Sequence, residues 1–301
     1  MDGILPLYKE RGMTSFACVS RLRQILKTRK IGHSGTLDPD VAGVLPICIG
    51  NATKVVDYLM QSGKQYQGEL LIGFSTTTQD LDGEKIAEKP VETEISSKKI
   101  KAAMAKLTGA ITQIPPMYSA VKVNGKKLYE YARAGETVER PKRQVEIKKF
   151  ELLSSKYDKK NKQQRIRFNV ECSKGTYIRT LVVELAQQLG YPGVMSILTR
   201  LKSGGFTLEQ TLSLANVQDA VATQTLQQYM YPLDYALKEY PQITIQMPQW
   251  KKVQNGGWLS PNELNTNEQE IVLLFDGQVK ALYHFDTKNK MYKPTKMFAI
   301  K

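Results

Sequence analysis

The sequence predicts a mixed α/β protein in which a large first domain is followed by a small β domain. The chain has 301 residues, about twice the length of an average domain, so we expect more than one. Up to residue 240, short apolar strands are interspersed with segments of helical periodicity. In residues 241–301, short alternating β segments are separated by Asn/Gly turns, which is typical of a small all-β barrel.

The charge balance is strongly basic, with 43 Lys and Arg against 29 Asp and Glu and a formal net charge of +14. Such a balance favours a polyanionic partner such as nucleic acid, although a basic surface can also serve solubility alone. Because no apolar run of membrane-spanning length and no signal-peptide start occurs, we expect a soluble, cytoplasmic protein without a membrane partner. Three scattered cysteines, two histidines and the lack of a glycine-rich nucleotide motif predict neither a metal nor a cofactor.

The N-terminal elements are a short apolar strand at residues 3–8 and an amphipathic helix that Thr14 or Ser15 caps. The expected inner face of the helix consists of Phe16, Val19, Leu22 and Ile25 or Leu26. The basic residues at its end, within residues 27–30, suit the helix dipole and direct positive charge towards the loop that follows.

Residues 31–50 form the first candidate for a catalytic site. Two carboxylates, Asp38 and Asp40, flank a proline, and residues 44–49 form an apolar run that predicts a buried strand. A polar loop that a strand anchors in the core is a common way to present a catalytic carboxylate. The alternative is a plain Asp-Pro turn in which Asp38 bonds its own backbone. The glycines that allow tight turns and close backbone approach here are Gly32, Gly35 and Gly43.

Three further elements precede the middle of the chain. Asn51 is expected to cap a short helix, and residues 64–73 predict a strand with Tyr66 near its start. A polar turn over residues 75–83 then leads to a helix that opens within the pair Ser96-Ser97.

The most basic stretch of the chain follows, at residues 115–149. Between residues 122 and 149, nine Lys and Arg stand against four Glu. Tyrosines are interleaved with these charges, and the combination suits phosphate contacts together with base stacking. The alternative is a solvated helix face whose tyrosines pack inward. The tyrosines are Tyr118, Tyr129 and Tyr131.

Residues 143–153 and 165–172 predict two paired strands joined by a charged hairpin at residues 156–164. A corner then leads into a helix with Arg179 in its first turn and Gly190 as its cap. Because a cation at this place opposes the helix dipole, Arg179 indicates an anionic partner nearby. The strand expected after this helix spans residues 198–206.

Five motifs over residues 1–206 resemble, in the same order, those of the bacterial TruB family of tRNA pseudouridine synthases. They are Gly32-His33-Ser34-Gly35-Thr36-Leu37-Asp38-Pro39, Lys64-x-Tyr66, Thr76-x-Thr78-x-Asp80-x-x-Gly83, Pro115-Pro116-x-Tyr118-Ser119-Ala120-x-Lys122 and Ser173-Lys174-Gly175-Thr176-Tyr177-Ile178-Arg179. One Gly-x-Thr-Leu-Asp would be weak evidence, whereas five motifs in family order are specific. The C-terminal segment resembles the PUA domain that these enzymes often carry.

The resemblance implies an enzyme that acts on the uridine at position 55 in the T loop of tRNA, cuts its N-glycosidic bond and rejoins the base through C5. It implies that Asp38 is the essential carboxylate, Tyr66 the residue stacked on the base, and Arg179 the salt-bridge partner of Asp38. The residues implied to contact the substrate, besides Tyr66, are His33, Tyr177 and Leu198.

The resemblance also implies the architecture: a mixed central β-sheet with flanking helices as the catalytic domain in residues 1–240, an RNA-gripping insertion at about 115–143, and a PUA-like RNA-binding β-barrel in residues 241–301. The implied partner is tRNA, bound through its T arm and elbow, and we expect a monomer that uses no metal and no cofactor. The departures from the family pattern, none at a proposed catalytic position, are Glu10, Asp40-Val41-Ala42, Glu184 and Ala186.

The chemistry requires a group that traps an electron-poor sugar or adds to the base, and a carboxylate can do either. That carboxylate must be ionised while shielded from water, so we expect a buried Arg179 to keep Asp38 charged. Attack on C1′, addition to C6 and removal of a sugar proton by Asp38 all stay open. Tyr66 offers a flat surface for the base and a hydroxyl that can remove the C5 proton.

Three polar residues have narrower expectations. His33 is a candidate for filling the space that a flipped base leaves in the RNA, and otherwise it is an ordinary polar loop residue. Asp80 is expected to bond backbone in the Thr-rich turn, and Asp40→Ala is expected to stay active.

Two rival function classes fit parts of the sequence. A non-catalytic RNA-binding or RNA-folding module would use the same basic surface, and its tRNA binding and role would survive Asp38→Ala. A carboxylate-dependent glycosidase is disfavoured, because no second carboxylate is placed as its acid and the charge of +14 would serve no purpose on a neutral sugar. Modification and tRNA folding can also coexist in one protein.

Overall fold

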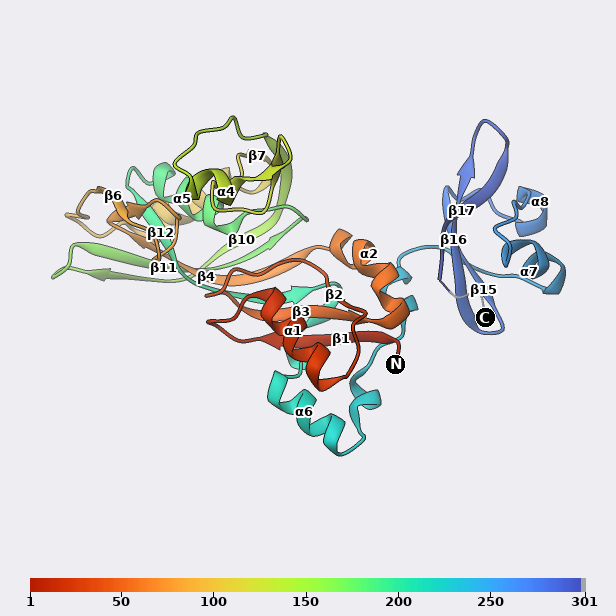
Figure 1. Cartoon of the computed structure of the whole chain (residues 1–301). Helices are drawn as coiled ribbons and strands as arrows, with labels where there is room; N and C mark the ends of the chain where they lie inside the picture. The colour runs from red at the N-terminus through yellow and green to blue at the C-terminus, as the bar shows by residue number, and fades with distance from the viewer. Residues whose placement is uncertain (299–301) are drawn as a thin grey trace.

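A nine-stranded mixed sheet forms the body of the molecule (Figure 1), and the computed structural model describes residues 1–298. Its strands lie in the order β1-β3-β12-β4-β11-β10-β7, with β2 paired to β3 and β13 to β12. Only the β3–β12 pair is parallel. The strands are β1 Gly3–Lys9, β2 Ile31–His33, β3 Ala42–Ile49, β4 Lys64–Ile72, β7 Gly109–Gln113, β10 Arg143–Asp158, β11 Gln163–Cys172, β12 Gly193–Ser203 and β13 Phe206–Thr207.

Helix α1 (Ser15–Ile25) begins where the sequence predicts, because the Thr14 side chain accepts a hydrogen bond from the backbone of the third residue of the helix. The predicted inner face is wrong at Phe16, which is 66% exposed. Ser15 points inward instead and bonds the loop before β3, which rotates the buried stripe of the helix by one position. The buried residues of α1 are Ser15, Cys18, Val19 and Leu22.

The segment after β3 differs from the predicted capped helix. A 3₁₀ turn, Gly50–Val55, precedes the short helix α2 (Val56–Gln61). Asn51 lies inside the turn, and its backbone N–H and side chain donate to the Asp2 carboxylate at 3.0 and 2.8 Å. Asn51 therefore ties the chain start to this turn and does not cap a helix.

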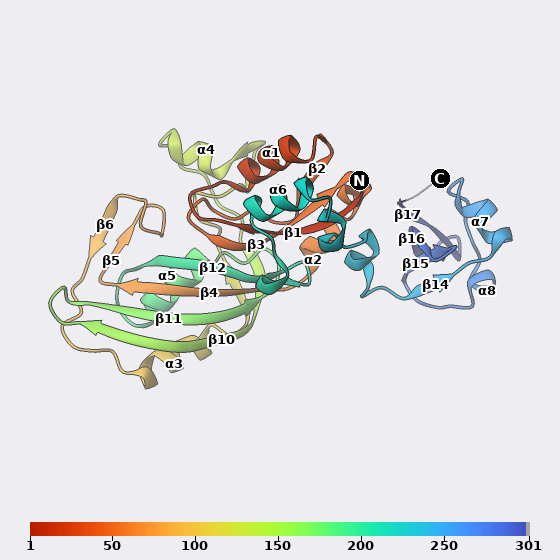
Figure 2. The same ribbon diagram turned by 90° about the horizontal axis from the view of Figure 1, so that it is seen from below.

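The largest core cluster lies between the middle of the sheet and two helices, α3 (Ser97–Lys106) and α5 (Ile178–Gln188). Helix α3 begins as predicted, with the Ser96 side chain as its cap. Alternate residues of β11, from Ile166 to Cys172, are fully or almost fully buried in this cluster. Figure 2 shows β12, β4, β11 and β10 side by side, with α3 next to β10.

The hairpin between β10 and β11 is much shorter than predicted, because the strands continue to Asp158 and restart at Gln163. Polar side chains at the end of this ribbon hold the segment before α3. Gln164 is fully buried and exchanges two hydrogen bonds of 2.8 Å with the backbone of Ile95. The Tyr157 hydroxyl donates to the Val91 carbonyl at 2.8 Å.

Two excursions leave the sheet. The polar turn predicted at residues 75–83 connects a small hairpin, β5 (Phe74–Thr76) and β6 (Lys85–Glu88), that was not predicted as strands. Residues 114–142 leave the sheet from β7 and return to β10, and Gln113 and Arg143 pair in register. The second excursion contains β8 (Lys122–Val123), β9 (Lys126–Lys127) and α4 (Leu128–Arg133).

The C-terminal unit lies beyond α2, at the end of the body where the N-terminus is found (Figures 1 and 2). Its four-stranded sheet has the order β14-β15-β16-β17, and β-strands were predicted in this part of the chain, although not the last one. The prediction of an all-β unit is wrong, because two short helices pack beside the sheet. One helix follows a glutamine cap and the other follows a serine cap. The elements after β13 are α6 Leu214–Ala222, β14 Gln242–Thr244, α7 Met247–Val253, α8 Pro261–Leu264, β15 Glu270–Phe275, β16 Gln278–Asp286 and β17 Met291–Met297, with 3₁₀ turns at Leu208–Gln210, Leu226–Tyr229 and Leu233–Leu237.

Candidate active site

The loop between β2 and β3 carries Asp38, and its backbone is fixed from two sides. Ser15 accepts a hydrogen bond from the Leu37 N–H at 2.9 Å and donates to the Leu37 carbonyl at 3.2 Å. Lys9 is fully buried at the end of β1, and its Nζ donates to the Pro39 carbonyl at 2.9 Å. Burial lowers the pKa of Lys9. A carboxylate on a loop held in this way is preorganised, because few alternative backbone positions are open to it.

Asp40, on the same loop, is directed elsewhere. Its carbonyl accepts a hydrogen bond from Arg11 at 3.0 Å. Its carboxylate lies beside Asp82, and a side-chain hydrogen bond with Asp40 raises the pKa of Asp82. The two carboxylates that flank Pro39 are therefore in different surroundings.

Arg179 lies against Asp38, with its Nε 3.0 Å from the Asp38 Oδ2. Its guanidinium also donates to the carbonyls of Thr78 at 2.9 Å and Tyr118 at 2.8 Å, and it lies 3.7 Å from the Asp80 carboxylate. The Arg179 side chain is 7% exposed but that of Asp38 is 45% exposed. The anionic partner inferred from the helix dipole is thus present, whereas the expected shielding of Asp38 from water is not found in the free protein.

Asp80 has the backbone contacts expected of a structural residue. Its Oδ1 accepts a hydrogen bond from the Thr78 hydroxyl and another, at 3.2 Å, from the Asp82 N–H. Since Thr78 also bonds Arg179 through its carbonyl, the Thr-rich turn is one wall of the pocket that holds the guanidinium.

Tyr66 and Leu198 lie inside the main core cluster together with Leu37, the neighbour of Asp38 in the chain. They are 7% and 6% exposed. Burial raises the pKa of Tyr66, and the charge of Arg200 opposes this rise. Leu198 pairs in register with Gly68, where an added Cβ would lie 2.9 Å from the Leu198 Cδ1. The glycine therefore makes room for a side chain that the sequence predicts to contact substrate.

Tyr177 occupies the cap position of α5, one residue before the helix that positions Arg179. Gln113, almost completely buried, holds its backbone from both sides: the Tyr177 N–H donates to the Gln113 Oε1 at 3.0 Å, and the Gln113 Nε2 donates to the Tyr177 carbonyl at 3.3 Å. Burial raises the pKa of Glu184 on the same helix, and a hydrogen bond with Gln113 partly offsets the rise. The sequence analysis missed Gln113, because a single glutamine at a strand end has no distinctive pattern.

His33 is half-buried at the end of β2, directly before the loop that carries Asp38. Its buried Nδ1 has no hydrogen-bond partner among the described residues. Burial lowers the pKa of His33, and the nearby charge of Arg200 lowers it further. Both effects favour the neutral form of the imidazole.

Arg200 is the main residue that the sequence analysis missed. It is 1% exposed, and it donates to the carbonyls of Val44 at 2.8 Å, Gly35 at 3.1 Å and Thr36 at 3.4 Å. The signal in the sequence is one arginine in a strand of mainly apolar residues, and this signal is weak without the partner segments. All six predicted site residues lie on or directly beside the elements that Arg200 and Arg179 connect: Asp38, Tyr66, His33, Arg179, Tyr177 and Leu198.

Comparison with known proteins identifies the arrangement. A model of the TruB family pseudouridylate synthase N-terminal domain matches residues 23–178, and a model of the tRNA pseudouridylate synthase B C-terminal domain matches residues 179–238. The chain is 86% identical over 300 residues to the tRNA pseudouridine synthase B of Limosilactobacillus reuteri, and 55% identical over 302 residues to that of Levilactobacillus brevis, with both chains covered completely in each case. The chain belongs to the TruB family of pseudouridine synthases.

Solved structures agree with this TruB-family fold. A Cbf5–Nop10–Gar1 complex contains a chain that matches with a TM-score of 0.75 at 24% identity, over 99% of this chain and 85% of the other. An H/ACA RNP bound to a substrate RNA containing 2′-deoxyuridine contains another, with a TM-score of 0.72 at 22% identity, over 99% and 85%. At these identities the likeness concerns the fold, and it confirms the predicted mixed sheet with flanking helices.

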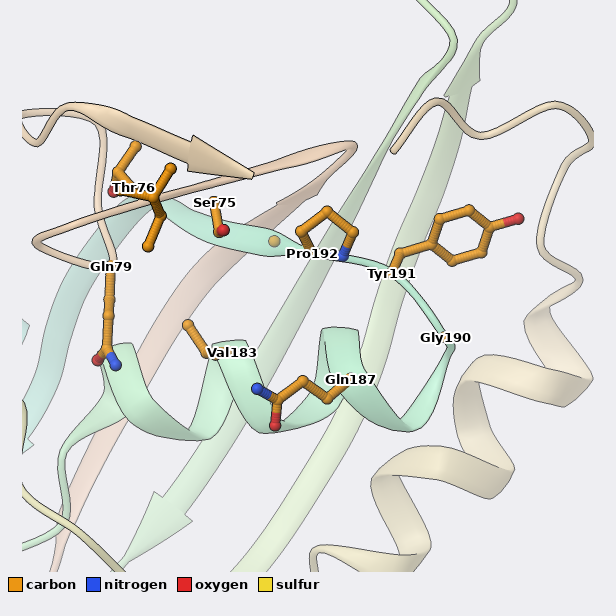
Figure 3. Close-up of a pocket in the computed structure, with 10 residues that line it drawn as sticks. Ser75, Thr76, Gln79, Val183, Gln187, Gly190, Tyr191 and Pro192 are labelled. Carbon is orange, nitrogen blue, oxygen red and sulfur yellow. The ribbon is translucent and has the colours of Figure 1, made fainter. Parts of the chain in front are cut away.

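The part of the chain that contains the nine-stranded sheet also has a surface pocket of about 460 Å³ beside α5. Figure 3 shows α5 along one side of it, with Val183 and Gln187 projecting from the helix and Ser75 and Thr76 opposite. None of the six predicted site residues lines this pocket, so it is distinct from the Asp38 site.

None of the helices within residues 1–298 has the length and apolar character needed to cross a membrane.

Proposed function

We propose that this TruB-family protein converts the uridine at position 55 in the T loop of tRNA to pseudouridine, with Asp38 as the carboxylate that acts on the flipped nucleotide. The observation that carries the proposal is the 3.0 Å ion pair of Asp38 with Arg179, which joins a fixed loop to the first turn of α5. Relatives named tRNA pseudouridine synthase B support tRNA as the substrate. The cytoplasm is proposed as the compartment. In the isomerisation the N1–C1′ bond breaks, a C5–C1′ bond forms, C5 loses a proton and N1 gains one.

Asp38 is reachable by a substrate because it is half-exposed, while Arg179 holds one of its oxygens from the protein side. Attack on C1′, addition to C6 and removal of a sugar proton all start from the ionised carboxylate. A charge-assisted hydrogen bond from a buried guanidinium favours that ionised form once the bound RNA excludes water from the site.

Tyr66 and Leu198 are proposed substrate contacts although both are more than nine-tenths buried in the free protein. A base stacked inside the tRNA elbow cannot reach such side chains, so the contact requires a base that is flipped into the site, at a cost of a few kcal/mol. The other proposed substrate contacts are His33 and Tyr177, which lie half-buried at the ends of β2 and α5.

The insertion at about 115–143 is proposed to grip the RNA. The ring centre of Tyr129 lies 5.4 Å from the Lys127 ammonium and 5.3 Å from the Arg133 guanidinium. A half-exposed ring between two cations suits base stacking together with phosphate contacts. Tyr131 is likewise half-exposed, with the Lys126 ammonium 4.6 Å from its ring centre, and its hydroxyl donates to the Val123 carbonyl at 3.0 Å.

The insertion is also connected to the reaction centre, because the Tyr118 carbonyl accepts a hydrogen bond from Arg179. We propose residues 1–240 as the catalytic domain and residues 241–301 as a second RNA-binding domain, with eight Lys against five Asp and Glu in the latter. Such an excess of positive charge supports contact with the tRNA backbone.

The test is tritium release from a T-arm RNA hairpin labelled at uridine C5, with wild type compared with Asp38→Asn and with Asp40→Asn as the matched control. Release by wild type and by Asp40→Asn, but not by Asp38→Asn, is expected. Tight binding of the hairpin without release by any of the three would favour the non-catalytic RNA-binding module. Equal release by all three would leave the activity standing and exclude Asp38 as the acting carboxylate.

A further inference from the structure

Arg200 is a buried cation without a carboxylate partner among the described residues: it donates to three backbone carbonyls, and a side-chain hydrogen bond joins it to Tyr66. It is 1% exposed and the largest fully buried side chain of the described chain. Burying a guanidinium without a carboxylate is unfavourable unless its donors are well satisfied. A charged residue kept in such a place indicates a role beyond filling space.

The acceptors of Arg200 lie on both sides of Asp38 in the chain. Gly35 and Thr36 precede the aspartate, and Val44 follows it on β3. A single planar guanidinium therefore closes the loop at both of its ends, which its fixed fork of five N–H donors allows and a lysine ammonium does not.

The backbone of Arg200 is equally close to the returning strand. Gly43 has φ +119°, and a Cβ built there would lie 2.2 Å from the Arg200 carbonyl oxygen and 2.7 Å from its nitrogen. Gly43 and Arg200 are register partners in the parallel β3–β12 pair. The glycine is required because the chain leaving the loop runs directly against the strand that carries the arginine.

On its other side Arg200 faces the strand that carries Tyr66. The two residues are register partners in the antiparallel β12–β4 pair. Burial lowers the pKa of Lys64, two residues before Tyr66, to about 8, and Arg200 is the largest charged contributor to that effect. The positive charge of Arg200 thus lowers the pKa of Lys64 on β4 and also that of His33 on β2.

We propose that Arg200 is a positioning residue of the active site, whose guanidinium couples the loop of Asp38 to the strand of Tyr66 so that both groups keep a fixed separation during the reaction. The inference rests on the proposed function in one respect: Asp38 and Tyr66 are the groups that act on the uridine. Arg200 acts through the loop and the strand, because its guanidinium donates to the backbone carbonyls of Gly35, Thr36 and Val44.

The test compares Arg200→Lys and Arg200→Gln with wild type, using single-turnover rates and dissociation constants for the T-arm hairpin. A displacement of about 1 Å between reacting groups lowers the rate about a hundredfold, and we expect a loss of this order in both variants with an unchanged dissociation constant. The control is Glu69→Gln, another buried charged residue on β4 but three residues from Tyr66 and on the opposite face of the sheet. It should lower the unfolding temperature and leave the rate unchanged.

Wild-type rates in folded Arg200→Lys and Arg200→Gln would overturn the proposal, whereas no release by wild type would overturn the proposed function instead. If neither variant folds, amide hydrogen exchange of wild type decides. Coupling predicts that the Leu37 and Val41 amides open with the same free energy as the β4 amides next to Tyr66. Loop amides that exchange while the strand stays protected would contradict it.

Discussion

The protein contains two arginine–carboxylate networks that are built in opposite ways. At the candidate active site the arginine is buried and the carboxylate of Asp38 is 45% exposed. In the middle of the sheet the carboxylate of Glu69 is buried, at 5% exposed, and its partners Arg165 and Arg167 are 48% and 62% exposed. The carboxylate is therefore accessible to solvent at the candidate active site, whereas the arginines are accessible in the Glu69 network.

The acceptor sites of the two carboxylates are used differently. Glu69 receives hydrogen bonds on both oxygens, from Arg165 at 2.7 Å, Arg167 at 3.2 Å and the Ser196 hydroxyl at 2.8 Å. Asp38 is held through Oδ2 alone by Arg179, which is itself fixed by two backbone carbonyls. The first network therefore holds strands together, and the second holds an anion ready for a further partner.

The largest effect that separates the networks is expected at Asp38. Asp38→Asn should lower the single-turnover rate at least a thousandfold, because removal of a group that takes part directly in the reaction costs that order. The unfolding temperature should change less than the rate, since Asp38 is half-exposed and Arg179 keeps its hydrogen bonds to the carbonyls of Thr78 and Tyr118. Rates come from tritium release and stability from circular dichroism. Asp40→Asn, on the same loop, should stay within about threefold of wild type, given the usual size of surface substitutions.

Arg179→Lys is expected to lower the rate about a hundredfold, the order seen when one preorganised donor is removed from an active site. An ammonium cannot bond Asp38 and also donate to the carbonyls of Thr78 and Tyr118 in the directions that the guanidinium uses. Turnover of the C5-labelled hairpin provides the measurement. Near wild-type turnover would show that a point charge is sufficient and would remove the reason for an arginine at this position.

Substitutions of Tyr66 test whether its hydroxyl takes part in the reaction or its ring only supplies a stacking surface for the base. Tyr66→Leu should lose about 1–3 kcal/mol of base stacking, equivalent to about fivefold to 150-fold weaker productive binding. Tyr66→Phe keeps the ring, so its single-turnover rate reports on the hydroxyl alone. Full activity of the phenylalanine variant would exclude the hydroxyl as the group that removes the C5 proton.

The sequence predicted the loop of Asp38 from a glycine-rich Asp-Pro segment, and an anionic partner near Arg179 from a cation at a helix start. That these two residues pair was implied by the resemblance to the TruB family. Arg200 escaped prediction because its role depends on three carbonyls more than 150 residues away in the chain. The inner face of α1 was misassigned at Phe16 for a similar reason, since the inward turn of Ser15 depends on Leu37. Periodicity identifies elements, but it does not show which polar residues they bury against each other.

The smallest predicted effect concerns the network of Glu69, Arg165 and Arg167 and the pH dependence of its contribution to stability. Burial alone would raise the pKa of Glu69, but hydrogen bonds from Arg165, Ser196 and Arg167 outweigh it and lower the pKa below the ordinary 4.5. A carboxyl group whose pKa is lower in the folded state stabilises the fold above its unfolded pKa and loses this contribution as the pH falls through the folded value.

The difference in free energy of unfolding between wild type and Glu69→Gln should therefore be about 2 kcal/mol at pH 7, the size of a hydrogen-bonded charged group, and should shrink as the pH falls below 4.5. Urea unfolding at pH 3–7 measures it. A difference that is constant with pH would mean that the Glu69 side chain contributes by packing and not by its charge. The catalytic rate at pH 7 should be equal in both proteins, because this network, unlike that of Asp38, has no charge left for a substrate.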